Sequence, residues 1–339
     1  MERVPHERSV LIVIPALNEA SCIAAVIESL REDLPRDALV SLVVVDGGSS
    51  DGTAQLVRQL AQSAPELRLL HNPARIQAAA VNLAARTVGQ AADVLIRCDA
   101  HAHYPRGFVR RLLETLERTG ADAVVVPMDS VGGQSCLQRA VAWVADTPLG
   151  SGGSAHRGGR RSGFVDHGHH AAFRMASFRR CGGYDERFTH NEDAELDCRQ
   201  RRLGGTVYLD ADIRVAYQPR ATLGALAKQY FLYGRGRSRT VRRHPGSIRA
   251  RQLAVPAHLA SLLAALALSP WWPLLLAWPL LYALVVGAAS IQGVVRHRSA
   301  CALLCGPAAA LMHLSWGVGF FAGLIGIRES AWLGAISPS

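Results

Sequence analysis

The sequence predicts an α/β protein with a doubly wound, mostly parallel sheet, followed by a region of membrane-spanning helices. Short apolar runs at residues 10–14, 39–45 and 94–98 alternate with segments whose apolar side chains repeat at helical spacing. This alternation is typical of buried parallel strands joined by helices. Acidic residues follow the second and third runs, at the strand ends where such sheets bind ligands. From residue 253 onward, long apolar runs carry almost no charge.

The elements follow one another in the order that this fold class requires. Residues 10–14 form the first strand, which Pro15 should end because proline cannot continue a hydrogen-bonded ladder. Residues 18–21 can cap a helix whose apolar residues, up to Leu34, lie on one face. Beyond the second strand we expect strands at 67–70, 94–98 and 121–126 and helices at 76–87 and 108–116.

A glycine-rich loop, residues 46–53, follows the second strand. Its glycines permit close approach of a ligand to the backbone, and Asp46 and Asp51 offer fixed acceptors that suit a base or a ribose. The loop lacks the lysine of a Walker loop and the spacing of a dinucleotide fingerprint. The alternative interpretation is a turn with a helix cap made by Ser50 or Asp51.

Potential metal ligands occur in two places. Asp99 and His101 lie two residues apart after a buried strand, so an extended chain would present both on one side to a metal ion or a metal-bound phosphate. A simple polar turn is the alternative. His167, His169 and His170 suggest zinc, but alternation puts the third on the opposite face, so a three-ligand site is geometrically awkward.

Four carboxylates at positions 192, 193, 195 and 197 open a helix that should run to about Leu203. Acids at a helix N-terminus are favoured by the helix dipole, which explains some of them structurally. One that points into a cleft could deprotonate a substrate hydroxyl. Spacing alone cannot choose among the four.

Earlier in the chain, residues 151–163 are rich in glycine and arginine and predict either a mobile loop over an anionic ligand or an ordinary connector.

The C-terminal region is predicted to cross a membrane. Apolar runs at 253–269, 272–291 and 301–327 approach or exceed the roughly 20 residues that a spanning helix needs, although the first could be a buried soluble hairpin. An amphipathic helix at 223–233 precedes them. Between residues 235 and 251 there are arginines but no acids, which marks the cytoplasmic side and attracts anionic lipid. Nucleic acid is not expected as a partner, because the segment lacks aromatic platforms and zinc spacing.

Composition adds two limits. The chain has 339 residues and a formal net charge of +10, and its seven cysteines include no Cys-x-x-Cys pair, so a disulfide scaffold is not expected and a reducing compartment fits. No cleavable signal is evident at the N-terminus. We divide the chain into a soluble domain at 1–222, a basic membrane-surface segment at 223–251 and a membrane domain of about three helices at 252–339.

An ordered set of motifs resembles the family 2 glycosyltransferases, which have the GT-A fold. The nearest type is the bacterial exopolysaccharide glucosyltransferase of the succinoglycan kind, which adds glucose to a polyprenyl-diphosphate-linked sugar. Each motif is weak by itself, but their order is specific. They are Ile14-Pro-Ala-Leu-Asn-Glu19, Val45-Asp-Gly-Gly-Ser-Ser-Asp-Gly-Thr53, Asp99-Ala-His101, Gly182-Gly-Tyr-Asp-Glu186, Asn191-Glu-Asp193 and the segment Gln229–Arg237.

The resemblance implies a role for each matching position. Asp99 would hold a divalent metal, Mn²⁺ or Mg²⁺, with His101 in the third position of the usual Asp-x-Asp. Asp193 would be the general base with Glu192 beside it. Residues implied to bind the nucleotide sugar and its diphosphate are Pro15, Asn18, Glu19, Asp46, Asp51, Arg97, Gln229, Arg235 and Arg237, although the spacing of the last three departs from the Gln-x-x-Arg-Trp of processive synthases.

Three functions are considered. The first is an inverting transferase that moves a sugar, with glucose from a UDP donor as the expected case, to a lipid-linked saccharide in cell-surface glycan synthesis. The second is a polyprenyl-phosphate sugar synthase, and the third is a non-catalytic, membrane-anchored nucleotide-sugar binder. The resemblance and the charge pattern imply a multi-pass protein of the bacterial inner membrane with its catalytic domain in the cytoplasm.

Overall fold

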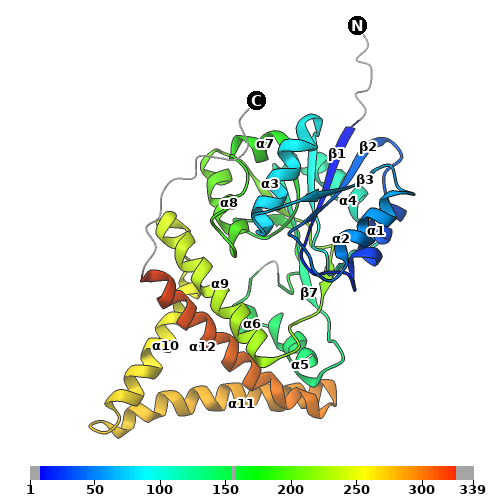
Figure 1. Ribbon diagram of the computed structural model, residues 1–339. Coiled ribbons are helices and arrows are strands. Elements are labelled where there is room, and N and C mark those ends of the chain that lie inside the picture. Colours follow the sequence, from blue (N-terminus) through cyan, green and yellow to red (C-terminus); the bar gives the residue numbers. More distant parts are fainter. Residues whose placement is uncertain (1–7, 155–156, 326–339) are drawn as a thin grey trace. The chain divides into compact units, whose positions relative to one another are not determined.

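The computed structural model describes residues 8–154 and 157–325 (Figure 1). These residues form two compact units, one made of residues up to 128 with 159–216, and another made of 129–158 with 217 onward. The three domain ranges drawn from the sequence remain a prediction. The two units are described separately below.

The first unit is built on an eight-stranded sheet with the strand order β3-β2-β1-β4-β9-β6-β10-β8. Strands β3, β2, β1 and β4 are parallel, whereas β9 runs antiparallel to β4 and β6, its neighbours on either side. The strands are β1 (Arg8–Ala16), β2 (Ala38–Asp46), β3 (Leu67–His71), β4 (Val94–Arg97), β6 (Ala123–Val126), β8 (Gly163–Phe164), β9 (His169–Arg174) and β10 (Val207–Leu209).

The first strand continues past Pro15, contrary to the sequence-based expectation. Pro15 pairs with Val45 on β2, and the strand ends one residue later. The carbonyl of Val13 accepts from Cys98 on the β4 side, and residues two apart in a strand face the same way. The missing N–H of Pro15 therefore points toward β4, whose pairing with β1 has already ended at Val13.

Amphipathic helices cover the sheet and form the core with it. The predicted helices at 23–34, 76–87 and 108–116 are confirmed, with small shifts at their ends. Leu11, Val43, Leu95, Phe173 and Tyr184 belong to one buried apolar cluster. The helices are α1 (Ile23–Glu32), α2 (Thr53–Ala61), α3 (Gln77–Thr87), α4 (Phe108–Thr119), α7 (Met175–Arg180) and α8 (Glu192–Arg202), with a short turn η1 (Gly89–Ala91). A separate three-stranded sheet has the order β5 (Ala102–His103), β11 (Val215–Tyr217), β7 (Met128–Ser130).

The second unit is helical, and three of its helical segments are long and apolar enough to cross a membrane. These segments are residues 250–268, 273–297 and 300–324, which confirms the three predicted apolar spans; residues 326–327 of the third prediction lie outside the described residues. The elements are α5 (Cys136–Ala145), α6 (Pro148–Ser151), α9 (Leu223–Arg243), η2 (Pro245–Ser247), α10 (Ala250–Leu268), η3 (Pro273–Leu276), α11 (Ala277–His297), η4 (Ala300–Leu304) and α12 (Cys305–Leu324).

Helix α9 is longer than the predicted 223–233 and runs through the first arginines of the basic segment. It lies along α12 (Figure 1). A Cβ at Gly234 would overlap the carbonyl of Trp316, and one at Gly319 would overlap the carbonyl of Phe231. Glycine at these positions therefore lets the two helix backbones approach closely.

One disulfide joins Cys136 on α5 to Cys301 on η4, 165 residues apart in the chain. The other five cysteines are free, and four of them are buried. Spacing along the chain gave no indication of this pair, because only the folded second unit brings the two thiols together.

Candidate active site

The loops after β1 and β2 are held together by hydrogen bonds. The backbone N–H of Asn18 donates to the Ser49 hydroxyl over 2.8 Å, and the N–H of Ser50 donates back to Asn18 Oδ1 over 2.9 Å. Asn18 adopts a left-handed conformation, with φ of 58°, which asparagine tolerates better than most residues. The Glu19 N–H donates to the Thr53 hydroxyl over 2.9 Å. The first motif and the glycine-rich loop thus form one structure.

The two aspartates of the glycine-rich loop shape the loop itself. Asp46 is buried, and its Oδ2 accepts from the backbone N–H groups of Gly48 and Ser49 over 2.9 and 3.1 Å. Asp51 accepts from the Thr53 hydroxyl over 2.5 Å and from the Ala20 N–H over 3.0 Å. These two hydrogen bonds lower the pKa of Asp51. Both carboxylates therefore shape turns of the loop, but the predicted cap by Ser50 or Asp51 is not formed, because the N-cap of α2 is Gly52 and has no side-chain hydrogen bond.

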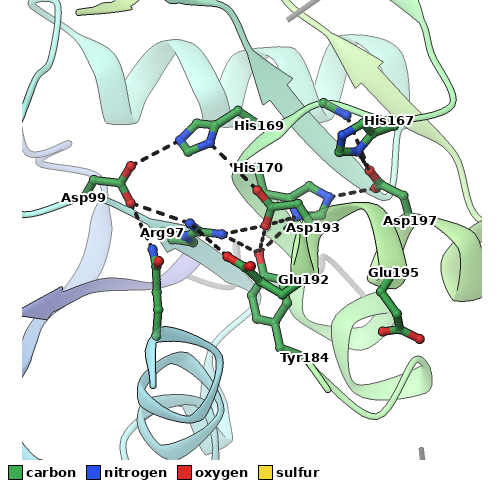
Figure 2. Close-up of polar contacts among 12 residues, drawn as sticks. Arg97, Asp99, His167, His169, His170, Tyr184, Glu192, Asp193, Glu195 and Asp197 are labelled. Atoms are coloured by element: carbon green, nitrogen blue, oxygen red, sulfur yellow. Dashed lines mark hydrogen bonds and ion pairs between the residues drawn. The ribbon is translucent and has the colours of Figure 1, made fainter. Parts of the chain in front are cut away.

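Arg97, the last residue of β4, lies among three carboxylates and is only 6% exposed. Its Nη1 donates to Asp193 Oδ1 over 2.5 Å, and its Nη2 lies 3.6 Å from Asp99 Oδ1 and 3.5 Å from Glu192 Oε1 (Figure 2). Among the described residues its Nε has no hydrogen-bond partner. The family resemblance implies that Arg97 binds the nucleotide sugar. In the structure its guanidinium contacts acids from two motifs that are far apart in the chain.

Asp193 is held by three donors on one oxygen. Besides Arg97, the Tyr184 hydroxyl and His170 Nδ1 each lie 3.0 Å from Oδ1 (Figure 2). Burial acts to raise the pKa of Asp193, but Arg97 and His170 outweigh it and hold that pKa well below its usual range. Asp193 is therefore an ionised carboxylate, and its Oδ2 has His169 Nδ1 as a neighbour at 3.8 Å.

His170 is fully buried between two carboxylates. Its Nδ1 faces Asp193 and its Nε2 lies 2.7 Å from Asp197 Oδ1. Burial acts to lower the pKa of His170, but Asp197 and Asp193 raise it to about 10. The ring is thus an imidazolium that donates in both directions. Spacing along the chain indicates this histidine only as a possible zinc ligand, because it does not show that the residue lies inside β9, next to β4.

The remaining histidines face different carboxylates. His167 Nδ1 lies 2.9 Å from Asp197 Oδ2, and His169 Nε2 lies 3.5 Å from Asp99 Oδ2. Within residues 8–154 and 157–325, no three His, Cys, Asp or Glu side chains converge so as to hold a metal ion by themselves. The three-histidine zinc site is therefore not formed in this part of the chain.

Asp99 and His101 leave the end of β4 in different environments. Asp99 Oδ1 accepts from Gln77 Nε2 over 3.0 Å, and His101 Nδ1 lies 2.9 Å from Glu19 Oε1. Burial acts to raise the pKa of Asp99, but His169, Arg97 and His101 together lower it. An ionised carboxylate with imidazoles on either side thus occupies the strand end.

The four acids of α8 have different partners in the structure. Glu195 is buried and pairs with Arg199, whose Nη2 lies 2.7 Å from Glu195 Oε2, so this acid stabilises the helix. Asp197 contacts His167 and His170. Glu192 and Asp193 face Arg97, as Figure 2 shows.

Glu192 should make the stability of the enzyme depend on pH. Burial and the neighbouring Asp193 raise its pKa to about 7, although Arg97 acts to lower it. An unfolded glutamate has a pKa of about 4.3, so the folded state binds the extra proton between these values and loses stability as the pH rises through this window. The melting temperature of the wild type minus that of Glu192→Gln should therefore decrease as the pH rises from about 4 to about 7.

Glu66→Gln is the matched control for this experiment. Burial acts to raise the pKa of Glu66, but a hydrogen bond from Arg31 outweighs it and lowers the pKa. Both folded and unfolded chains are then ionised at this position above about pH 5, so the corresponding difference should stay constant. A constant difference for Glu192→Gln as well would contradict a protonated, buried carboxyl group.

Gln229, Arg235 and Arg237 all lie on α9, in the second unit. Gln229 Nε2 donates to the Tyr233 hydroxyl over 3.1 Å. The carbonyl of Arg235 accepts from the Ser238 hydroxyl over 2.9 Å, and Arg237 is buried.

Comparisons with known sequences agree with these motifs. The profile described as Glycosyl transferase family 2 matches residues 11–182. The chain is 43% identical over 331 residues to the "Succinoglycan biosynthesis protein ExoA" of Rhizobium meliloti (strain 1021), covering 95% of this chain and 96% of that protein. It is 29% identical over 124 residues to the "Polyprenol monophosphomannose synthase" of Mycolicibacterium smegmatis, covering 36% of this chain and 45% of that one.

Similarity to solved structures shows the fold of this chain. The mannosyltransferase PcManGT from Pyrobaculum calidifontis, solved with GDP-Man and Mn²⁺, has a TM-score of 0.57 at 20% identity and covers 92% of this chain and 86% of its own. GalNAc-T7, solved with UDP, GalNAc and Mn²⁺, has a TM-score of 0.50 at 15% identity and covers 70% of this chain and 48% of its own. The chain therefore belongs to glycosyltransferase family 2 and is a glycosyltransferase with the GT-A fold.

Proposed function

We propose that this enzyme transfers a sugar from a nucleotide donor to a lipid-linked saccharide in exopolysaccharide synthesis, with inversion at the anomeric carbon. The near full-length similarity to a succinoglycan biosynthesis protein supports this pathway class, and three apolar helical segments support a membrane-bound acceptor. The observation that carries the chemistry is the ionised Asp193 carboxylate, held through one oxygen beside Asp99 and Arg97. Glucose from a UDP donor is the sugar we expect.

Asp193 would act as the general base. Its Oδ1 is occupied by Arg97, Tyr184 and His170, so Oδ2 is the oxygen that would accept the proton of the acceptor hydroxyl as that hydroxyl attacks the anomeric carbon. The cationic His170, backed by Asp197, would hold the carboxylate in this orientation. Arg97 would also offset negative charge that develops on the leaving diphosphate.

Asp99 and His101 are the residues that would hold a divalent cation. The donor set fits, because an ionised carboxylate with imidazole neighbours suits Mn²⁺, whereas Mg²⁺ prefers oxygen ligands alone. The chain supplies fewer than three convergent ligands among its described residues, so diphosphate oxygens would complete the coordination. When bound, such a cation would neutralise charge on the leaving group.

The nucleotide would lie against the joined loops after β1 and β2. Pro15, Asn18, Glu19, Asp46 and Asp51 are the residues we assign to this pocket. Their mutual hydrogen bonds would hold the backbone of the pocket in place before the base and ribose arrive, which reduces the ordering cost of binding.

We assign the enzyme to the bacterial inner membrane with its catalytic unit in the cytoplasm. The basic segment supports this side, because arginines next to an apolar span mark the cytoplasmic face and attract anionic lipid. The arginines are Arg235, Arg237, Arg239, Arg242, Arg243, Arg249 and Arg251.

The test is to incubate membranes containing the full chain with a panel of radiolabelled nucleotide sugars and then to extract the lipids. We expect label in the lipid fraction from one donor, in the presence of Mn²⁺ or Mg²⁺ and not with a chelator. Asp99→Ala should abolish this metal-dependent transfer. Donor binding without any transfer to lipid or saccharide would overturn the proposal in favour of a non-catalytic binder.

A polyprenyl-phosphate sugar synthase is the second candidate, favoured by the partial similarity to a polyprenol monophosphomannose synthase. The lipid product distinguishes the two. A single labelled sugar attached to a lipid monophosphate, formed without any saccharide acceptor, would identify the synthase.

A further inference from the structure

Arg157, in the second unit, is a partly buried cation, and one nitrogen of its guanidinium is shielded from solvent. Its guanidinium carbon lies 4.7 Å from the ring centroid of Tyr217. Its Nη1 is buried and has no hydrogen-bond partner among the described residues. The nearby Asp146 is already used, since its two oxygens accept from the N–H and the hydroxyl of Ser130 over 2.8 and 3.1 Å.

The charge of Arg157 is retained in this environment. Burial acts to lower the pKa of Arg157, but Tyr217, Tyr233 and Tyr230 raise it, with Asp146 contributing less than any of the three. A guanidinium nitrogen that is shielded from water without an acceptor is costly. An anionic ligand would remove this cost by supplying the missing acceptor.

Three phenols lie near this cation, since Tyr217, Tyr233 and Tyr230 all act on its pKa. Tyr230 and Tyr233 lie on α9 with ring centroids 5.6 Å apart, and Gln229 donates to the Tyr233 hydroxyl. The Tyr217 and Ser130 hydroxyls lie 2.8 Å apart. Because the single Ser130 proton is donated to Asp146, the Tyr217 proton is used in this contact, and Tyr217 contributes the face of its ring to Arg157. A planar guanidinium with hydroxyl donors beside it matches the oxygens of a phosphate group.

We propose that Arg157, Tyr217 and Tyr230 form a subsite for the phosphate or diphosphate group of a polyprenyl-linked acceptor. This inference rests on the proposed function, which supplies a lipid-linked acceptor.

The surroundings of the subsite favour a lipid over a free nucleotide as the source of the phosphate. Tyr230 lies on α9, and α9 contacts α12 through Gly234 and Gly319. Tyr230 also packs against the apolar cluster that Leu226 of α9 forms with Met312 of α12. Because α12 lies in one of the three membrane-compatible segments, the tyrosine helix is attached to the part of the chain where a lipid phosphate would be found.

The experiment measures binding of labelled polyprenyl diphosphate to the full chain in nanodiscs, with polyprenol and UDP as separate probes. Arg157→Gln should weaken polyprenyl diphosphate binding by roughly 10–100-fold, the value of one or two charged hydrogen bonds. Polyprenol and UDP binding should not change. Arg161→Gln, at an exposed arginine of the same loop, is the matched control and should bind all three probes as the wild type does.

Equal binding of polyprenyl diphosphate by Arg157→Gln and the wild type would overturn the proposal. Loss of UDP binding alone would also overturn it, because the site would then serve the donor. If Arg157→Gln does not fold in a melting assay, Tyr230→Phe replaces it and should weaken the same probe several-fold.

The subsite and the proposed function fail in different ways. Binding that depends on Arg157, without sugar transfer from any donor, would retain the subsite and refute the transferase. Sugar transfer that is saturated by the same lipid concentration in wild type and Arg157→Gln would support the transferase and refute the subsite.

Discussion

Asp193→Asn should lower the rate of sugar transfer by about 10²–10⁴-fold, the contribution of a well-placed general base. Asparagine can still accept from Arg97 through its amide oxygen, so the side chain should keep its place in the cluster, but it cannot take a proton from the acceptor hydroxyl. The loss should therefore appear in kcat at saturating donor and acceptor, with the Kd of the nucleotide sugar unchanged.

Asp166→Asn is the control for this variant. Asp166 is half-exposed and pairs with Arg201 over 2.9 Å, and it lies outside the cluster around Arg97, so transfer should proceed at the wild-type rate. Full turnover by Asp193→Asn would contradict the general-base role. It would instead favour a polyprenyl-phosphate synthase, whose phosphate acceptor needs little deprotonation.

Arg97→Met should destabilise the first unit and also reduce transfer. The change removes the cation that Asp193, Asp99 and Glu192 share and leaves their carboxylates buried without it. Breaking a buried ion pair in this way costs about 3–5 kcal/mol, which for a domain of this size lowers the melting temperature by on the order of 10 °C. Thermal unfolding of the full chain in detergent measures the shift.

The matched control is Arg110→Met on α4. Arg110 pairs with Glu114 over 3.0 Å, and both side chains are largely exposed. Such surface pairs contribute less than about 1 kcal/mol, so its melting temperature should stay near that of the wild type. A shift for Arg97→Met as small as this one would show that the carboxylates are compensated by other groups.

Much of the fold could be predicted from the sequence because its signals are local. Apolar runs and helical periodicity identified β1, β2, β3, β4 and β6 and the helices α1, α3 and α4. The apolar spans were equally clear, since length and lack of charge decide them. The ends of these elements were less certain, as Pro15 shows, because the effect of a missing N–H depends on which neighbouring strand it faces.

The grouping of the site residues was not available from the sequence. Strand β9 inserts antiparallel between β4 and β6, and this pairing brings His169 and His170 to Asp99 and Asp193. No short-range pattern encodes a pairing between segments so far apart. The same reason explains the Cys136–Cys301 disulfide and the environment of Arg157, which depend on contacts within the second unit.

The sequence by itself determined the fold class, the membrane-compatible segments and the motifs that contain Asp99 and Asp193. Only the tertiary structure decided that Arg97 joins these two acids, that His170 lies as a cation between Asp193 and Asp197, and that Glu195 is structural. The physical reason is that periodicity reports burial along one element, whereas charge, pKa and hydrogen bonding depend on which side chains from other elements come within a few ångströms.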